Sequence, residues 1–150
     1  MKQKEFKGKF RSILWDVENL DVDGKKYFTY KEALEIAEKL GKRLPDIWDM
    51  EELIEHGYEW IDKRKGAIIG GLFFPASGFY YSGKNGGISH MDLQGAIWLN
   101  GKEPEHYPYK TYLRFHIRGN SPTFEEHGRD EQSKLPVRLV QDRWGKNKII

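Results

Sequence analysis

The sequence predicts an α+β fold, in which two helices near the N-terminal half are followed by small antiparallel sheets and long ordered loops. Helical periodicity is confined to residues 29–56 of a chain of 150. Eight Phe, eight Tyr and five Trp accompany 16 Gly. Because a large aromatic side chain buries about 150–250 Å² and glycine favours turns, this composition suits a fold with limited regular structure.

The first helix is predicted to begin after Thr29. Thr29 and Glu32 have the spacing of a capping box, in which each side chain accepts a hydrogen bond from a free backbone N–H. The apolar residues that follow recur at helical spacing, up to Leu40. Gly41 stands where a helix end favours a left-handed residue.

The second helix is predicted over residues 47–56. Residues 43–45 read Arg-Leu-Pro and are expected to be extended, since a residue before proline avoids the helical region. Asp46 is the expected N-cap, and Gly57 the expected stop.

Several short runs predict strands. Residues 1–28 read as strands and turns, and residues 67–74 form an apolar run around two glycines. Residues 96–99 are a candidate buried strand. Alternating apolar side chains predict a further strand whose inner face carries Leu113, Phe115 and Ile117. We expect a polar loop over 119–134 and a last strand over 137–140.

Charge and composition exclude several classes of protein. The net charge is +2, from 25 basic and 23 acidic side chains that are interspersed, so we expect no nucleic-acid partner. The chain has no cysteine, which excludes disulfides and thiolate chemistry. Neither a signal peptide nor an apolar run of the ~20 residues that a membrane span needs is present, and we expect a virion or cytoplasmic location without membrane insertion.

Four segments together resemble the Fibrobacter major-paralogue domain, a member of the C-type-lectin-like superfamily. The resemblance covers about residues 28–142 and implies one C-type-lectin-like domain over residues 1–150. It also implies that the Trp-containing segment is a central strand and that the last strand lies near the N-terminal strand. The segments are AEKLGKRLP with EEL (37–45 and 51–53), LFFPASG (72–78), AIWLN (96–100) and PVRLVQD (136–142).

Catalytic and metal-binding motifs fit this sequence poorly. The formylglycine-generating enzymes share the superfold, but the resemblance implies copper held by cysteines, which this chain lacks. Glu103-Pro104-Glu105 resembles one half of a lectin calcium site, yet the Trp-containing segment precedes it rather than follows it. Asn19, Asp21, Asp23 and Gly24 imitate the start of an EF-hand loop, but Tyr30 replaces the required Glu, which favours a plain turn. We therefore expect no metal and no cofactor.

The candidate binding residues lie in the Gly- and Tyr-rich stretch 75–109. Tyr, Gly and Asn combine rigid aromatic area with adaptable hydrogen bonding, as in many binding loops. The alternative is that these side chains pack the long loops onto the core. The candidates are Tyr80, Tyr81, Asn85, His90, Tyr107 and Tyr109.

These observations predict a non-catalytic recognition or assembly module. The first hypothesis is a phage-type virion surface component, such as a head fibre, decoration or tail protein, that contacts a glycan or another structural protein. Many copies acting together, as in a homo-oligomer, would strengthen weak contacts. The alternatives are a stand-alone carbohydrate-binding module and an enzyme of unknown type on the formylglycine-generating-enzyme superfold.

Overall fold

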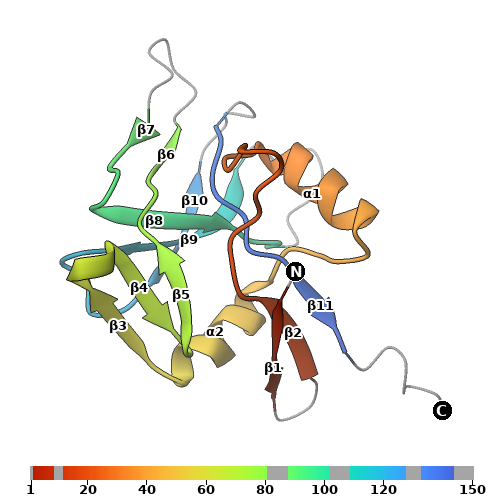
Figure 1. Cartoon of the computed structure of the whole chain (residues 1–150), viewed down its shortest axis with the longest axis horizontal. Coiled ribbons are helices and arrows are strands. Elements are labelled where there is room, and N and C mark those ends of the chain that lie inside the picture. Colours follow the sequence, from red (N-terminus) through yellow and green to blue (C-terminus); the bar gives the residue numbers. More distant parts are fainter. Residues whose placement is uncertain (1, 9–11, 81–87, 102–108, 128–132, 144–150) are drawn as a thin grey trace.

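The structure is a computed structural model that describes residues 2–8, 12–80, 88–101, 109–127 and 133–143. This part of the chain is a mixed α+β fold with two helices and small antiparallel sheets, as predicted (Figure 1). In chain order the elements are β1 (Gln3–Lys7), β2 (Ser12–Asp16), α1 (Tyr30–Lys39), α2 (Ile47–Glu55), β3 (Tyr58–Ile61), the 3₁₀ turn η1 (Asp62–Arg64), β4 (Gly66–Ile69), β5 (Leu72–Pro75), β6 (Phe79–Tyr80), β7 (Ile88–Ser89), β8 (Gln94–Trp98), β9 (Lys110–His116), β10 (Thr123–His127) and β11 (Val140–Asp142).

Antiparallel pairing organises the described strands into four small sheets. Their strand orders are β1-β2-β11, β10-β9-β8, β3-β4-β5 and β6-β7. β11 pairs with β2 between Val140 and Trp15, so the last strand lies beside the N-terminal hairpin. This pairing confirms the expected closure. Among the described residues no helix combines the length and the apolar character that crossing a bilayer requires.

Both helices begin where the local sequence predicts. Thr29 Oγ1 accepts the Glu32 N–H at 3.1 Å, and Glu32 Oε1 accepts the Thr29 N–H at 2.8 Å. Asp46 and Asp49 form the same reciprocal arrangement at the start of α2, at 2.8 and 2.9 Å. Each cap satisfies two backbone donors that a helix start leaves free, which fixes both helix starts.

The hydrophobic core has two clusters, one on each side of the β8–β9 pair. One cluster centres on Trp15, Phe74 and Phe115, with α2 packed against it. The other joins α1 to Trp98 and to the extended segment 135–139. The Trp98 indole N–H donates to the Phe28 carbonyl at 2.7 Å in this second cluster. Because both faces are covered, every residue of β8 is buried.

Several strand predictions were wrong in position. The last strand begins at Val140, because residues 136–139 bond to separate loop and strand segments rather than to one continuous strand. The expected polar loop 119–134 contains β10, which pairs with β9. Ile117 lies beyond β9 and is exposed, whereas Tyr112 is buried, since both faces of this sheet are covered.

In the stretch 75–109, the described residues contain β6, β7 and β8, of which only β8 includes a strand predicted from the sequence. The apolar run 67–74 falls within the antiparallel pair β4 and β5. Gly70 and Gly71 join these strands with φ of 59° and 86°, in the left-handed region that glycine adopts without strain. The two glycines therefore mark a tight hairpin turn.

Candidate functional site

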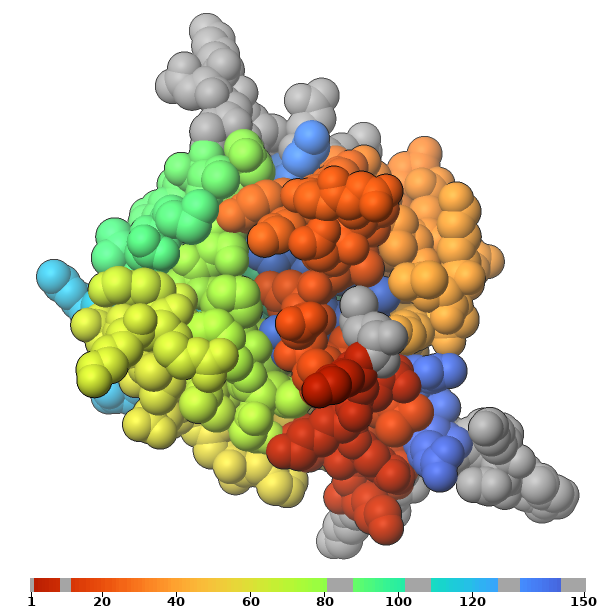
Figure 2. Space-filling view, viewed as in Figure 1, coloured from red at the N-terminus to blue at the C-terminus, as the bar shows by residue number. Residues whose placement is uncertain are grey.

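A groove of about 550 Å³ opens on the face between the segment that follows β2 and the edge formed by η1 and β5. Figure 2 shows the orange-red segment and the yellow-green strands on its two sides. The lining of the groove consists of residues 17–21, Lys26, Arg64, Phe73, Pro75, Ser77, Pro136 and Arg138.

The floor of the groove is a buried arginine. The Arg138 guanidinium donates from Nε to Asn19 Oδ1 at 2.8 Å, from Nη2 to the Phe73 carbonyl at 2.7 Å and from Nη1 to the Asp16 carbonyl at 3.4 Å. The central carbon of the guanidinium, Cζ, lies 4.0 Å from the centre of the Phe74 ring. This stacking and these bonds hold the plane of the guanidinium in one orientation.

Burial shapes the electrostatics of Arg138. Desolvation lowers the pKa of the guanidinium to about 9, although the negative charges of Asp16 and Glu18 act in the opposite direction. The group is therefore still a cation at neutral pH. Among the described residues, no carboxylate oxygen lies within 4.0 Å of it.

Backbone hydrogen bonds fix the segment that carries Arg138. The Leu20 N–H donates to the Val137 carbonyl at 2.7 Å, and the Asp16 N–H donates to the Leu139 carbonyl at 3.0 Å. The Trp98 N–H donates to the Pro136 carbonyl at 3.2 Å. Because three different parts of the fold bond to this short segment, the floor of the groove is rigid.

The walls of the groove carry both signs of charge. Arg64 stands on one rim, with its guanidinium carbon 3.8 Å from the centre of the Phe73 ring. Glu18 and Asp21 stand on the opposite rim, and Asp21 Oδ1 accepts the Gly24 N–H at 2.7 Å. The groove thus offers cationic donors, carboxylate and amide acceptors, and apolar area to one ligand.

The structure describes three of the six residues predicted as a binding site. Tyr80 packs edge-on against Tyr27, with ring centres 4.9 Å apart, and the Tyr27 hydroxyl donates to the Ser77 carbonyl at 2.6 Å. Ser77 lines the groove, but neither Tyr27 nor Tyr80 does. Tyr81, Asn85 and Tyr107 lie outside the described residues.

His90 and Tyr109 do not share one site with each other. His90 follows β7 and stacks on Phe79, with ring centres 5.9 Å apart. Tyr109 precedes β9. The start of β9 lies beside the end of β8, whereas His90 lies near the start of β8. The extended backbone rises about 3.3 Å per residue, so the length of β8 separates the two side chains.

The acidic run that imitates an EF-hand loop is a turn, as the sequence favours. Val22 and Lys25 pair across it, and Asp23 and Gly24 both have positive φ, of 52° and 93°. Asn19 is occupied by Arg138. Within the described residues, no group of three or more His, Asp and Glu side chains is placed to hold a metal ion. Residues 103–105, the half calcium motif, lie outside them.

Sequence patterns did not predict Arg138, Asn19 or Arg64 as residues of the groove. One signal was available for Arg138, since it is a single charge inside the apolar run Pro-Val-Arg-Leu-Val. A charged residue is almost never fully buried unless it has polar partners or a function. Nothing local marks Asn19 or Arg64, because they reach the groove from different elements.

No family model, no curated protein and no solved structure matches the chain. The fold and site define an α+β protein with a polar groove over a buried arginine.

Proposed function

We propose that this chain is a non-catalytic recognition module with a C-type-lectin-like fold, and that the groove over Arg138 binds a carbohydrate. The observation that carries the proposal is a groove of about 550 Å³ with a rigid floor and polar walls. Pockets for small ligands have volumes of about 300–1,000 Å³. The size therefore suits one or two sugar rings.

Positions of the segments that resemble the Fibrobacter major-paralogue domain support the proposed fold. Residues 43–45 lead directly into α2, and residues 72–75 form β5. Residues 96–98 belong to β8, which is central in the two-sided core. The closing strand β11 lies beside the N-terminal hairpin. The positions of β8 and β11 agree with what the resemblance implies.

The chemistry of the walls supports a sugar as the ligand. A sugar hydroxyl donates one hydrogen bond and accepts others, so it pairs with carboxylate, amide and cationic side chains at once. Glu18 and Asp21 supply acceptors, and Lys26 and Arg64 supply donors. The Phe73 ring in the lining offers aromatic area for a sugar face.

Calorimetry of the whole chain against a panel of neutral and acidic oligosaccharides tests this proposal. We expect at least one sugar to bind, and Arg64→Ala to weaken that binding by tenfold or more. Arg118→Ala is the matched control, because Arg118 is also exposed but does not line the groove. A flat response to the entire panel, or equal losses in the two variants, would contradict a glycan site in this groove.

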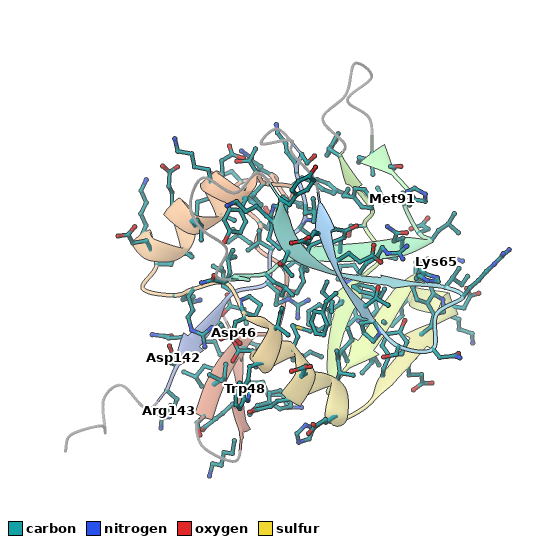
Figure 3. All side chains as sticks on the ribbon, turned by 180° about the vertical axis from the view of Figure 1, so that it is seen from behind. Asp46, Trp48, Lys65, Met91, Asp142 and Arg143 are labelled. Atoms are coloured by element: carbon teal, nitrogen blue, oxygen red, sulfur yellow. The ribbon has the colours of Figure 1, made fainter. Side chains whose placement is uncertain are left out.

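A second observation favours the assembly alternative, in which the chain contacts another protein. His90 and Asp92 both have positive φ, of 60° and 67°, which is strained for residues other than glycine. Met91 lies between these two residues and Leu93 follows them, and both side chains are about half exposed. Figure 3 shows Met91 at the surface. The Ile117 N–H donates to the Leu93 carbonyl at 3.0 Å, and the Ile117 side chain is also exposed. Exposed apolar clusters mark interaction surfaces.

This apolar cluster supports self-assembly, and the setting that we propose from the sequence is a surface component of a phage-type virion built from many copies. Light scattering after size exclusion tests the assembly. We expect a species larger than one chain, and the double variant Met91→Glu with Leu93→Glu to reduce it to a monomer. A monomer for the unmodified chain at all concentrations would contradict self-assembly through this surface.

A further inference from the structure

We infer that the groove selects a neutral sugar that carries an acetamido group, and that the side-chain amide of Asn19 binds the carbonyl of this group. The inference rests on the proposed function, because it names the class of ligand for the same groove. It starts from the orientation of one amide in the lining and from the groups that lie around it.

One contact fixes which end of the Asn19 amide is left for a ligand. Arg138 Nε donates to Asn19 Oδ1 at 2.8 Å, and a guanidinium can only donate hydrogen bonds. The amide oxygen must therefore face Arg138, since the flipped amide would set two donors against each other. Arg138 is fully buried, whereas Asn19 is half-buried and lines the groove. The NH₂ group of Asn19 is thus the end that the groove offers.

The fixed amide presents its donor in one direction. Arg138 is itself held by the Phe73 and Asp16 carbonyls, and its guanidinium stacks on the Phe74 ring. Because this support is rigid, little further side-chain entropy is lost when a ligand accepts from Asn19. A ligand that covers the amide without an acceptor would leave its N–H groups unpaired, which is unfavourable. The carbonyl of an acetamido group supplies this acceptor.

The carboxylates beside Asn19 favour a neutral ligand that donates. Glu18 and Asp21 are exposed on the same rim and would repel an anionic sugar. The N–H of an acetamido group carries no net charge, and a carboxylate accepts it in a charge-assisted hydrogen bond. An acetamido group therefore supplies both the acceptor that Asn19 needs and a donor for this rim.

An apolar wall faces the third part of the acetamido group, its methyl. Phe73 and Pro75 lie on the same face of β5, and both are partly buried and line the groove. Burying a methyl group against them removes apolar surface from water. A hydroxyl in place of the acetamido group has neither this methyl nor a carbonyl for Asn19. We therefore expect the groove to distinguish sugars by this one substituent.

Matched pairs of neutral disaccharides test the inference. The members of a pair differ only in whether a ring carries an acetamido or a hydroxyl group, as in N,N′-diacetylchitobiose and cellobiose, or N-acetyllactosamine and lactose. We expect the acetamido member of at least one pair to bind about tenfold more tightly or better at pH 7, by calorimetry. Equal affinities in every pair would overturn the inference and leave the carbohydrate site standing. Binding by no member of any pair would overturn both.

Asn19→Asp tests the amide itself. The substitution keeps an oxygen acceptor for Arg138 Nε and replaces the NH₂ group with a second oxygen. We expect this variant to melt no lower than the unmodified chain, to lose about tenfold or more in affinity for the acetamido disaccharide and to keep its affinity for the hydroxyl one. Asn120→Asp is the control, since Asn120 is exposed and does not line the groove. An unchanged preference in Asn19→Asp, an equal loss for both disaccharides, or the same effect in the control would overturn the inference.

Discussion

Arg43 and Asp142 form a bidentate ion pair across 99 positions of the chain, with Nε–Oδ2 at 3.0 Å and Nη2–Oδ1 at 2.9 Å. The same guanidinium donates from Nη1 to Asp49 Oδ2 at 2.7 Å, at the buried start of α2. Figure 3 shows Asp142 on the same side of the molecule as Asp46, the N-cap of this helix. Arg43 therefore ties the second helix to the closing strand.

Substitutions at Arg43 and at Asp142 are expected to lower the free energy of unfolding by unequal amounts. Arg43→Ala removes the guanidinium that pairs with the fully buried Asp49 side chain, and loss of one partner costs about 3–5 kcal/mol in comparable buried pairs. Asp142→Asn weakens a partly exposed pair, and we expect a loss below about 1 kcal/mol. Urea unfolding measures both variants. Equal losses would show that Asp49 does not depend on Arg43.

Gly95 is predicted to tolerate no side chain. It lies in β8, and a Cβ there would meet the ring of Phe115. We expect Gly95→Ala to lower the free energy of unfolding by about 1–3 kcal/mol, as overpacked cores do. Gly119→Ala is the matched control, since a Cβ at Gly119 would meet only His116, at 3.3–3.4 Å. A smaller loss for Gly95→Ala than for the control would show that β8 and β9 pack more loosely.

We expect the Trp98 indole to stabilise the fold through its N–H group as well as through its size. Its N–H donates to the Phe28 carbonyl at 2.7 Å inside the second core cluster. Trp98→Phe removes this bond and leaves unfilled volume, so we expect a loss of about 1–3 kcal/mol in denaturant unfolding. Trp48→Phe, at a side chain that is 58% exposed, should change stability by no more than about 0.5 kcal/mol. Similar losses at the two positions would contradict the buried bond.

Because Glu32 caps α1 with a carboxylate, we expect the stability of the fold to depend on pH. The hydrogen bond from Lys25 Nζ, at 2.6 Å, and that from the Thr29 N–H lower the pKa of Glu32, against a smaller effect of burial. A carboxyl whose pKa is lower in the folded state stabilises it above the unfolded pKa, and this contribution is lost as pH falls through the folded pKa. We expect Glu32→Gln to lower the melting temperature at pH 7 and to lower it less at pH 2.

Glu35→Gln serves as the control for this pH effect, because Glu35 lies exposed on the same helix without the capping bonds. Its melting temperature should follow that of the unmodified chain at both pH values. A Glu32→Gln difference that stayed constant between pH 7 and pH 2 would contradict the pKa direction.

Local sequence signals predicted the helices well, and non-local pairing explains most of what they missed. Thr29 and Asp46 cap helices through bonds that span three residues, so the sequence contains the whole signal. β3 and β10 were not predicted, since Glu59 and Glu125 on them are polar and their pairing partners lie elsewhere in the chain. Strand propensity depends strongly on such context.

The candidate site was predictable only in part. Tyr80 was predicted from the composition of its segment; it packs against Tyr27, whose hydroxyl donates to the Ser77 carbonyl, but Tyr80 does not line the groove. Arg138 was overlooked because its apolar neighbours made the segment read as an ordinary strand. Its partner Asn19 stands 119 positions away, and no periodicity relates two residues at that distance.

The most direct test of the account is an NMR titration that follows the Nε–H signal of Arg138 and the side-chain amide of Asn19 while the oligosaccharide that binds in calorimetry is added at pH 7. If the groove over Arg138 is the binding site, both signals shift in a saturable way and the amides of Phe73 and Ser77 shift with them. If these signals stay in place while others move, for instance those of the exposed turn around Met91, the ligand binds elsewhere and the central claim is wrong.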